Sequence, residues 1–252
     1  MVKRYELTDG QWAAICNLLP GKQGDRGRTG ADNRAFVNGV LWVLRSGARW
    51  SDLPSRYGEN WKTVHKRFSR WAHSGVWERV FRHLSGAPDN EYRMIDSTII
   101  RAHQTAASGK RGAPDQALGR SRGGLTTKIH LLADTLGRPV AIAISPGQAH
   151  DLQLAEALLD GQTARYVLAD RAYDARRLRE FIIGSGAEPV IPPNPTRKHP
   201  ADYDKTRYRD RNRIERLVNR LKRFRRIATR YDRRAAYFLA AIQLVACLEW
   251  LT

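Results

Sequence analysis

The sequence predicts an α/β domain with a mixed sheet, preceded by a small all-helical domain. Two observations support this prediction. Apolar residues recur at helical spacing through residues 5–84, and short apolar runs rich in Ile, Val and Thr then alternate with helical patterns from residue 92 onward. We place the boundary at the polar linker, which gives a helical domain over residues 1–88 and an α/β domain over residues 89–252.

The helical region opens at Thr8, a favourable N-cap, and Pro20 ends its first helix. A second apolar stripe over residues 36–44 ends near Gly47. The stretch 61–75 has one apolar stripe, and its basic residues lie outside that stripe. These basic residues fit either a helix-turn-helix reader of DNA or a solvated scaffold face, and they are Lys62, Lys66, Arg67 and Arg70.

Aromatic residues are frequent in the same region. We expect the tryptophans to form the core of the helical bundle and not a surface on which bases stack. They are Trp50, Trp61, Trp71 and Trp77.

The α/β region reads as three strands followed by helix, strand, helix and strand. The expected strands cover residues 92–103, 127–134, 139–146, 165–170 and 188–193, and the expected helices cover residues 150–160 and 173–186. A basic, Gly-rich loop over residues 105–124 separates the first two strands. From Tyr208 onward the pattern is helical again, and the apolar run 235–251 contains Gln243 and Glu249, so it predicts a buried core helix and not a membrane span.

Composition indicates the partner. The 252 residues carry 44 Lys and Arg against 25 Asp and Glu, a net charge of +19, and a polyanion is needed to neutralise such a surplus. Nucleic acid is therefore the expected partner. The two cysteines are far apart and exclude a disulfide framework or a zinc knuckle, which suits a reducing cytoplasm. We expect a cytoplasmic protein, associated with the nucleoid when bound to DNA, and no membrane contact.

Two acids occupy unusual positions in the predicted strands. Asp96 lies in the middle of an apolar strand, where a charge is costly unless it is paired, and Asp170 ends another strand just before a turn. Carboxylates that converge at a sheet edge repel each other, and a divalent cation relieves the repulsion. Two such cations commonly support phosphoryl transfer on DNA. For either acid alone, a cap or a buried ion pair explains the position equally well.

A third acid lies in the helical stretch that begins at Tyr208. Tyr208, Arg211, Glu215 and Lys222 have offsets of 0, 3, 7 and 14, which place them within an arc of about 60° on one helix face. The packing stripe falls on the opposite side, at Ile214, Leu217, Leu221 and Phe224. Taken alone, a Glu among cations is typical of an ion-pair network. Together with the two strand acids, it favours a metal site bordered by phosphate-binding residues.

These residues resemble a known family. Tyr208, Arg211, Glu215 and Lys222 match the Tyr–x2–Arg–x3–Glu–x6–Lys signature of bacterial insertion-sequence transposases with a DDE triad. The blocks MIDSTIIRAH, GGLTTKIHLLAD and VLADRAYD, and the leading RYELTDGQWAAICNLLP and RSGARWSDLP segments, are similar to the group named after insertion sequence five. The resemblance covers nearly the whole chain, in the expected order.

The resemblance implies an RNase H-like catalytic domain, with Asp96, Asp170 and Glu215 as the catalytic and metal-binding triad. It implies Mg²⁺, with Mn²⁺ as a substitute. Water would cleave a phosphodiester at the element end, and the freed 3′-hydroxyl would attack target DNA. Tyr208, Arg211 and Lys222 would contact DNA, with no covalent protein–DNA intermediate. The helical domain and the basic loop would recognise the terminal inverted repeats, with the protein a homodimer or higher oligomer on double-stranded DNA.

Two other functions remain open at this stage. One is a nuclease of the same fold that hydrolyses DNA without strand transfer, and the other is an inactive DNA-binding protein. Among neighbouring residues, Asp151 is expected to cap a helix, and His150 could touch DNA. His130 is expected to be a packed histidine, and Ser97 lacks a base partner for nucleophilic catalysis.

Overall fold

The computed structural model describes residues 5–22, 24–25, 30, 32–107, 116–121 and 123–251. The chain forms two compact units. One comprises Met1–Leu84, His103–Gly109 and Leu221–Thr252, and the other comprises Ser85–Ala102 and Lys110–Arg220. The domain boundary at residue 88 stays a prediction. Residues 108–115 and 122 of the predicted basic loop lie outside the described residues.

The first unit is helical. Its elements are α1 (Asp9–Cys16), α2 (Asn33–Ser46), η1 (Trp50–Asp52), η2 (Ser55–Tyr57), α3 (Trp61–His73), α4 (Val76–Leu84), α5 (Gln104–Ala107), α10 (Arg225–Ala228), the short strand β7 (Thr229–Arg230), α11 (Ala235–Cys247) and η7 (Leu248–Trp250). Thr8 forms a capping box with Gln11, which confirms the predicted start of α1. Gly47 ends α2 with a φ of 78°, a left-handed conformation that suits glycine.

Aromatic rings form the core of the helical unit. Trp77 is fully buried, Trp71 is nearly so, and the two ring centroids lie 5.3 Å apart. The prediction of a tryptophan core is correct for these two residues. Trp50 and Trp61, each at the first position of its helix, are only half-buried and lie at the margin of that core.

The predicted core helix near the end of the chain is confirmed as α11. Nine of its residues are buried, and it packs against α3 and α4. Residues from both ends of the sequence therefore build one helical core. Among the described helices, none is long and apolar enough to cross a membrane.

The second unit is built on a mixed sheet. Its strands are β1 (Tyr92–Ala102), β2 (Gly119–Ser121), β3 (Gly124–Asp134), β4 (Pro139–Pro146), β5 (Tyr166–Leu168) and β6 (Glu188–Val190). The strand order is β2–β3–β1–β5–β6, and β4 also pairs with β3. β1, β3 and β4 are antiparallel neighbours, whereas β1, β5 and β6 run parallel.

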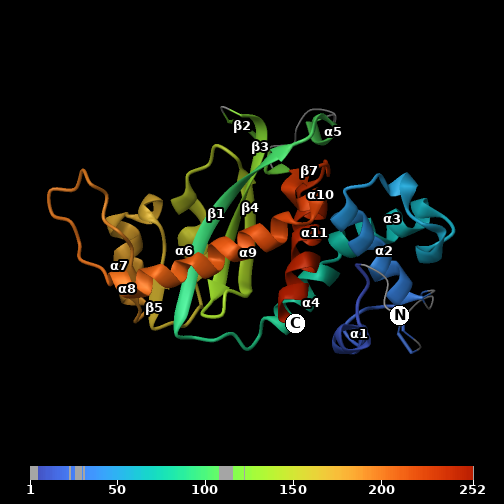
Figure 1. Ribbon diagram of the computed structural model, residues 1–252, viewed down its shortest axis with the longest axis horizontal. Helices are drawn as coiled ribbons and strands as arrows, with labels where there is room; N and C mark the ends of the chain where they lie inside the picture. Colours follow the sequence, from blue (N-terminus) through green and yellow to red (C-terminus); the bar gives the residue numbers. More distant parts are fainter. Residues whose placement is uncertain are drawn as a thin grey trace. The chain divides into compact units, whose positions relative to one another are not determined.

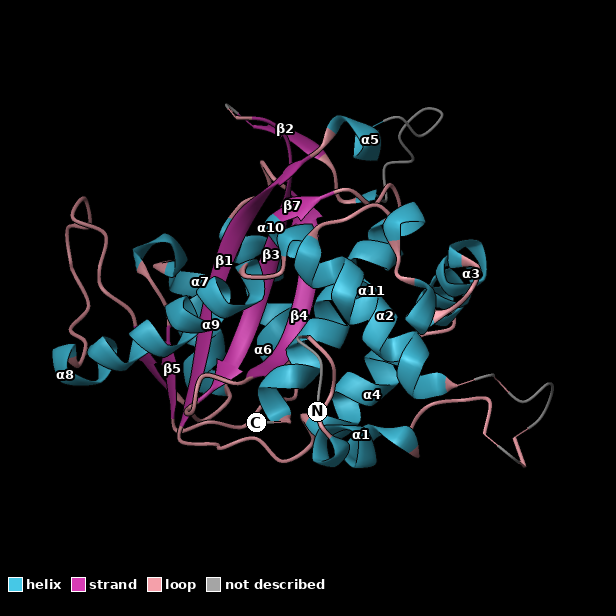
Figure 2. Ribbon diagram, turned by 45° about the vertical axis from the view of Figure 1, so that its right-hand side comes forward, coloured by secondary structure: helices cyan, strands magenta, loops and turns pink. Residues whose placement is uncertain are grey.

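Helices cover both faces of this sheet (Figures 1 and 2). One face packs against α6 (Ala155–Leu159) and α7 (Arg176–Gly184), which share a buried cluster with Ile95 and Leu132. The other face is crossed by α9 (Asn212–Lys222), whose Ile214 and Leu217 are fully buried. The remaining short helices are η4 (Asp151–Leu154), η5 (Arg171–Tyr173), α8 (Lys205–Tyr208) and η6 (Arg209–Arg211). The predicted RNase H-like fold, a mixed sheet flanked by helices, is confirmed.

The turn between β3 and β4 holds α9 in place. Arg213 donates to the backbone oxygen of Thr135 at 2.6 Å, and Arg220 donates to that of Gly137 at 3.1 Å. Gly137 has a φ of 76°, and a Cβ there would lie 3.0 Å from the Cβ of Arg213. Glycine therefore lets the helix approach the turn closely. This contact fixes the helix that carries Glu215.

We predict that Trp77→Ala lowers the free energy of unfolding by about 3–5 kcal/mol, because it leaves a large cavity in the helical core. Trp61→Ala is the matched control and should cost less than half as much, since Trp61 is only half-buried. Urea unfolding followed by far-ultraviolet circular dichroism measures both values. Equal losses of unfolding free energy in the two variants would contradict a larger contribution of Trp77 than of Trp61 to the core.

Candidate functional site

Asp96 lies in β1, where it pairs with Leu131 of β3. The preceding residues, Met94 and Ile95, are fully buried and anchor the strand. Ile95 packs toward α6 and α7, so the alternation of a strand turns Asp96 to the face that α9 crosses. The backbone N–H of Ser97 donates to Oδ1 of Asp96 at 2.9 Å. A carboxylate thus sits on the α9 face of a buried strand, with 17% of its side chain exposed.

Asp170 follows the neighbouring parallel strand. Met94 of β1 pairs with Leu168 of β5, so Asp96 and Asp170 each lie two residues beyond one paired position. Neighbouring strands lie about 4.8 Å apart, so the two acids lie at the same level along the sheet, Asp96 within β1 and Asp170 just beyond the end of β5. Oδ1 of Asp170 accepts a hydrogen bond from Ala172 N at 2.8 Å and so caps η5. The cap fixes where the chain turns away from the sheet.

Arg211 links the strand acid to the helix acid. Its Nη2 lies 2.5 Å from Oε1 of Glu215, and its Nη1 lies 3.6 Å from Oδ2 of Asp96. Nη1 is buried and has no hydrogen-bond partner among the described residues. Glu215 is half-exposed, so it faces solvent on one side and Arg211 on the other. One guanidinium therefore bridges two acids that are distant in sequence.

The electrostatics of Asp96 reflect this arrangement. The pKa of Asp96 is raised to about 6, mainly by burial and to a smaller extent by the negative charges of Asp170 and Glu215. Arg211 and the Ser97 N–H oppose the rise. All three carboxylates that the sequence singled out belong to this unit, and the charges of the other two act on Asp96.

The donor set fits a hard divalent cation. All three side chains offer carboxylate oxygens, the ligands that Mg²⁺ and Mn²⁺ prefer. Among the described residues, no group of three or more His, Cys, Asp or Glu side chains already has metal-binding spacing. The charge between Asp96 and Glu215 is instead balanced by Arg211. The chemistry of the site therefore suits a metal, and the guanidinium occupies the position of a counterion.

The predicted single helix from Tyr208 to Phe224 is wrong in detail. Tyr208 ends α8, the chain then forms the 3₁₀ turn η6, and α9 begins only at Asn212. Phe224 lies beyond α9, at the start of α10. The prediction that Tyr208 shares one helix face with Arg211, Glu215 and Lys222 is therefore wrong, because a 3₁₀ turn advances by about 120° per residue.

The four signature residues differ in their proximity to the acids. Arg211 and Glu215 still meet, whereas Lys222 lies at the last position of α9, about 10 Å further along the helix axis than Glu215. The Tyr208 ring centroid lies 5.9 Å from the Arg211 guanidinium carbon, so Tyr208 packs beside the arginine that bridges the acids.

A second polar network lies behind Asp96, and the sequence interpretation missed it. The Ser97 hydroxyl donates to Oδ1 of Asp151 at 2.6 Å, and Nζ of Lys128 lies 2.6 Å from the same oxygen. The expectation that Asp151 caps the helix is wrong, because His150 is the capping residue. His130 is fully buried and hydrogen-bonded to Ser145, as expected of a packed histidine. The Lys128–Asp151 ion pair ties β3 and η4 to the residue next to Asp96.

The basic residues of α3 divide into two kinds. Lys62, Lys66 and Arg70 are exposed and follow one another at intervals of four residues, which makes a single stripe. Arg67 is half-buried. Its guanidinium carbon lies 4.4 Å from the Phe36 ring centroid, and it donates to Asn33. Three of the four predicted DNA contacts are thus free to meet an external partner.

Two protein families match the chain by sequence. One is described as a putative transposase of the IS4/5 family and matches residues 7–81. The other is described as a transposase DDE domain and matches residues 88–250, about two thirds of the chain. The second match contains all three acids and the Tyr208–Lys222 signature.

Individual relatives include two putative transposases. An uncharacterized protein of Sinorhizobium fredii is 44% identical over 107 residues, 42% of this chain and 83% of its own length. A putative transposase for insertion sequence element IS6501 of Brucella ovis is 39% identical over 129 residues, 50% of this chain and 99% of its own. A putative transposase for insertion sequence element IS402 of Burkholderia cepacia is 32% identical over 134 residues, 48% of this chain and 61% of its own.

A solved structure supports the fold. The piggyBac transposase, in a synaptic complex with hairpin DNA, aligns with a TM-score of 0.52 over 94% of this chain and 70% of that chain. The two sequences are 10% identical, so the likeness concerns the fold alone.

We predict that divalent metal stabilises the protein more strongly above pH 6 than below it. The pKa of Asp96 is raised to about 6, so a proton competes with metal below that pH. Without metal, the Asp96 carboxyl binds its proton more tightly in the folded state than in the unfolded chain, where its pKa is near 3.8. The free energy of unfolding therefore falls as pH rises from about 4 to 6. Thermal unfolding with millimolar MgCl₂ or MnCl₂ should show a larger Tm increase at about pH 7.5 than at about pH 5.5.

The control for this measurement is Asp96→Asn, which removes the titrating group. The metal-induced increase in Tm should then be small at both pH values. An equal increase at both pH values in the unsubstituted protein would contradict the assignment of Asp96 as a metal ligand.

Proposed function

The chain belongs to the bacterial insertion-sequence transposases that carry a DDE domain, and on that basis we propose that it uses Asp96, Asp170 and Glu215 to cut and join DNA at the element ends. The placement of the three acids in one unit supports the proposal. Met94 of β1 pairs with Leu168 of β5, and Asp96 and Asp170 each follow two residues later on their own strand. Arg211 bridges Asp96 to Glu215. The family requires a divalent metal, and the oxygen donors suit Mg²⁺ with Mn²⁺ as a substitute.

The reaction consists of two phosphoryl transfers. Water attacks a phosphodiester at the element end and releases a 3′-hydroxyl, and this hydroxyl then attacks a phosphodiester of the target DNA. When bound, a pair of divalent ions supplies activation of the attacking oxygen and stabilisation of the leaving oxygen. Asp96, held by the buried strand β1 and by the Ser97 N–H, and Asp170, held by its cap on η5, present their carboxylates from a fixed frame.

Arg211 has two roles in this proposal. Without metal, it neutralises Asp96 and Glu215. With metal and DNA present, its guanidinium is released to contact a phosphate near the cleaved bond, for which its planar fork is suited. Its buried Nη1, which makes no hydrogen bond to a described residue, supports the idea that its present position is a resting one. Tyr208 and Lys222 would contact DNA beside it, and Tyr208 is not a nucleophile.

The helical unit supplies recognition of the terminal inverted repeats in this proposal. The exposed stripe of Lys62, Lys66 and Arg70 on α3 suits contact with DNA phosphates. Arg67 would have to leave its contacts with Phe36 and Asn33 to take part. Because two element ends must be brought together, the active form would be a dimer or a higher oligomer on DNA.

We expect Asp96→Asn, Asp170→Asn and Glu215→Gln each to reduce cleavage and joining by at least about 1000-fold while binding to element ends persists. Each change keeps the shape of the side chain and removes its charge. Asp160→Asn, at an exposed acid of the same unit, is the matched control and should leave activity intact. The assay combines end DNA, a supercoiled plasmid and Mg²⁺. Full activity in any one of the three variants would remove that acid from the triad, and cleavage without joined products would indicate a nuclease instead.

The role of α3 has its own test. The double variant Lys66→Gln/Arg70→Gln should bind element ends more weakly, and the slope of log K against log salt should fall by about 2, since two phosphate contacts are lost. Arg79→Gln/Arg82→Gln on the neighbouring helix α4 removes the same charge from exposed positions and should change the slope little. The same loss for both variants would mean that α3 contributes only general charge. Deleting residues 1–84 is a poorer experiment, because α11 would lose α3 and α4 as packing partners.

A further inference from the structure

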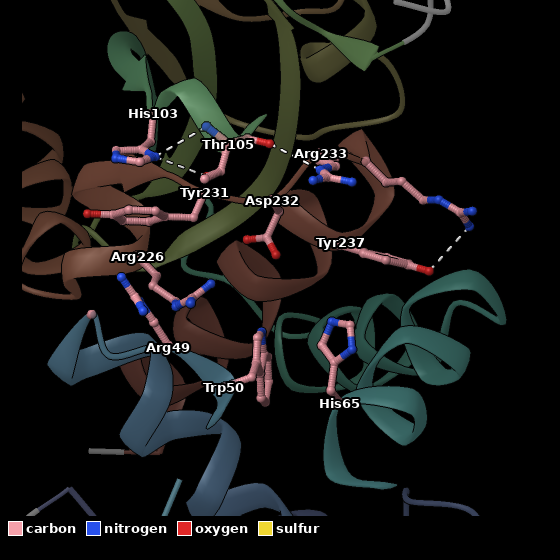
Figure 3. A pocket seen from close by; sticks show the side chains of 12 residues that line it. Arg49, Trp50, His65, His103, Thr105, Arg226, Tyr231, Asp232, Arg233 and Tyr237 are labelled. Carbon is pink, nitrogen blue, oxygen red and sulfur yellow. Dashed lines mark hydrogen bonds between the residues drawn. The ribbon is translucent and has the colours of Figure 1, made fainter. Parts of the chain in front are cut away.

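The helical unit contains a pocket of about 680 Å³ that the proposed chemistry does not use (Figure 3). It is lined by residues from η1, α3, α5, α10, α11 and the segment before α11. Asp96, Asp170 and Glu215 are not among its lining residues. The pocket combines aromatic rings with both signs of charge.

Flat aromatic surfaces form part of the wall. Trp50, which the sequence interpretation assigned to the core, lines the pocket with its ring 5.0 Å from that of His65. Tyr231 lines it too, with its ring 4.9 Å from that of His103. The Arg226 guanidinium carbon lies 5.9 Å from the Trp50 ring centroid and 5.3 Å from that of Tyr231, and Arg226 donates twice to the backbone oxygen of Ala48. These rings are therefore held in place before any ligand arrives.

Asp232 places a carboxylate within this aromatic wall (Figure 3). Among the described residues it has no ion pair within 4.0 Å, although Arg226, Arg230 and His65 are near enough to affect its pKa. Burial raises the pKa of Asp232, and the residue is still partly exposed to solvent. A ligand that donates hydrogen bonds would satisfy this group.

Cations lie at the rim of the same pocket. Arg49, Arg233 and Arg234 are exposed and line it. Arg233 is oriented by a hydrogen bond of 3.2 Å to the backbone oxygen of Thr105, and Arg234 donates to the Tyr237 hydroxyl at 3.3 Å. Exposed guanidinium groups at a rim suit phosphate, because their planar forks match its oxygens.

We propose that this pocket binds an unpaired guanine nucleotide of DNA, with the base against the aromatic wall and Asp232 accepting from its N1–H and its amino group. The two donors of the guanine edge match the two oxygens of one carboxylate, whereas thymine offers a single N–H between two acceptors. Stacking on Trp50 and Tyr231 would hold the ring, and Arg49 and Arg233 would bind the flanking phosphates. Because a paired guanine hides this edge, the nucleotide must be unpaired. The inference rests on the proposed function, which makes DNA the partner.

Fluorescence anisotropy with the full chain tests the proposal. The probes are a labelled short oligothymidylate and the same strand with one central guanine, both in EDTA, so that metal and the three acids play no part. We expect the guanine-containing strand to bind about tenfold more tightly, in line with one bidentate base contact. The preference should vanish when the guanine is replaced by inosine, which lacks the amino group, or is paired with a complementary strand. Equal binding of all probes would overturn the proposal.

Two variants separate Asp232 from general charge. Asp232→Asn should abolish the preference for guanine, whereas Asp9→Asn, at an exposed acid of the same unit, should retain it. Both changes remove one negative charge. Retention of the preference in Asp232→Asn would overturn the role of the carboxylate. Competition with free dGMP tests the source of the nucleotide: dGMP that competes as well as the oligonucleotide would overturn the assignment to DNA.

A measurement on the unsubstituted protein guards against a variant that fails to fold. The central guanine of the probe is replaced by 6-thioguanine, and the protein–DNA complex is irradiated. The crosslinked peptides are then identified by mass spectrometry. Crosslinks to Trp50, Tyr231 or His103 are expected, and crosslinks confined to residues outside the pocket would overturn the proposal. The outcome is independent of the plasmid joining assay, so failure of the triad assignment and failure of the pocket assignment can be told apart.

Discussion

The ion pairs of Arg211 are the interaction on which the arrangement of the acidic site depends. Asp96 is held in a strand and Glu215 in a helix, and like charges on these two elements repel each other. Arg211 lies within 3.6 Å of Asp96 and 2.5 Å of Glu215, so one cation offsets the repulsion. The contacts of Arg213 and Arg220 with the β3–β4 turn fix α9 against the sheet. The site is therefore held by basic side chains on one short stretch of chain.

The two faces of the sheet hold different polar groups. Alternation along β1 sends Ile95 and Ser97 to the α6 and α7 face and Asp96 to the α9 face. On the first face, the Lys128–Asp151 pair holds the Ser97 hydroxyl. On the second, the same strand presents a carboxylate to α9. A strand buried on both sides can hold a charged residue in a defined position only because each face has its own polar partners.

Much of this could be predicted from sequence, because its signals are local. Strand patterns, the Thr8 cap, the α11 core helix and the spacing of Arg211 and Glu215 are all readable from short windows. What could not be predicted depends on long-range contacts or on local backbone detail. The 3₁₀ turn at Arg209–Arg211 has no clear sequence signal, and the pairing of Asp151 with Lys128 joins residues 23 positions apart. Trp50 looks like a core residue by composition, yet it lines a pocket since its neighbours come from residues 226–237.

The composition of the helical core has a consequence for biosynthesis. Its partners, α3 and α4 on one side and α11 on the other, are separated by the whole of the α/β unit in the chain. During translation, the early helices emerge long before the segment that completes their packing. A nascent chain would thus display apolar helix surfaces until α11 leaves the ribosome. A truncated translation product could retain every acid of the α/β unit and still lack a finished helical core.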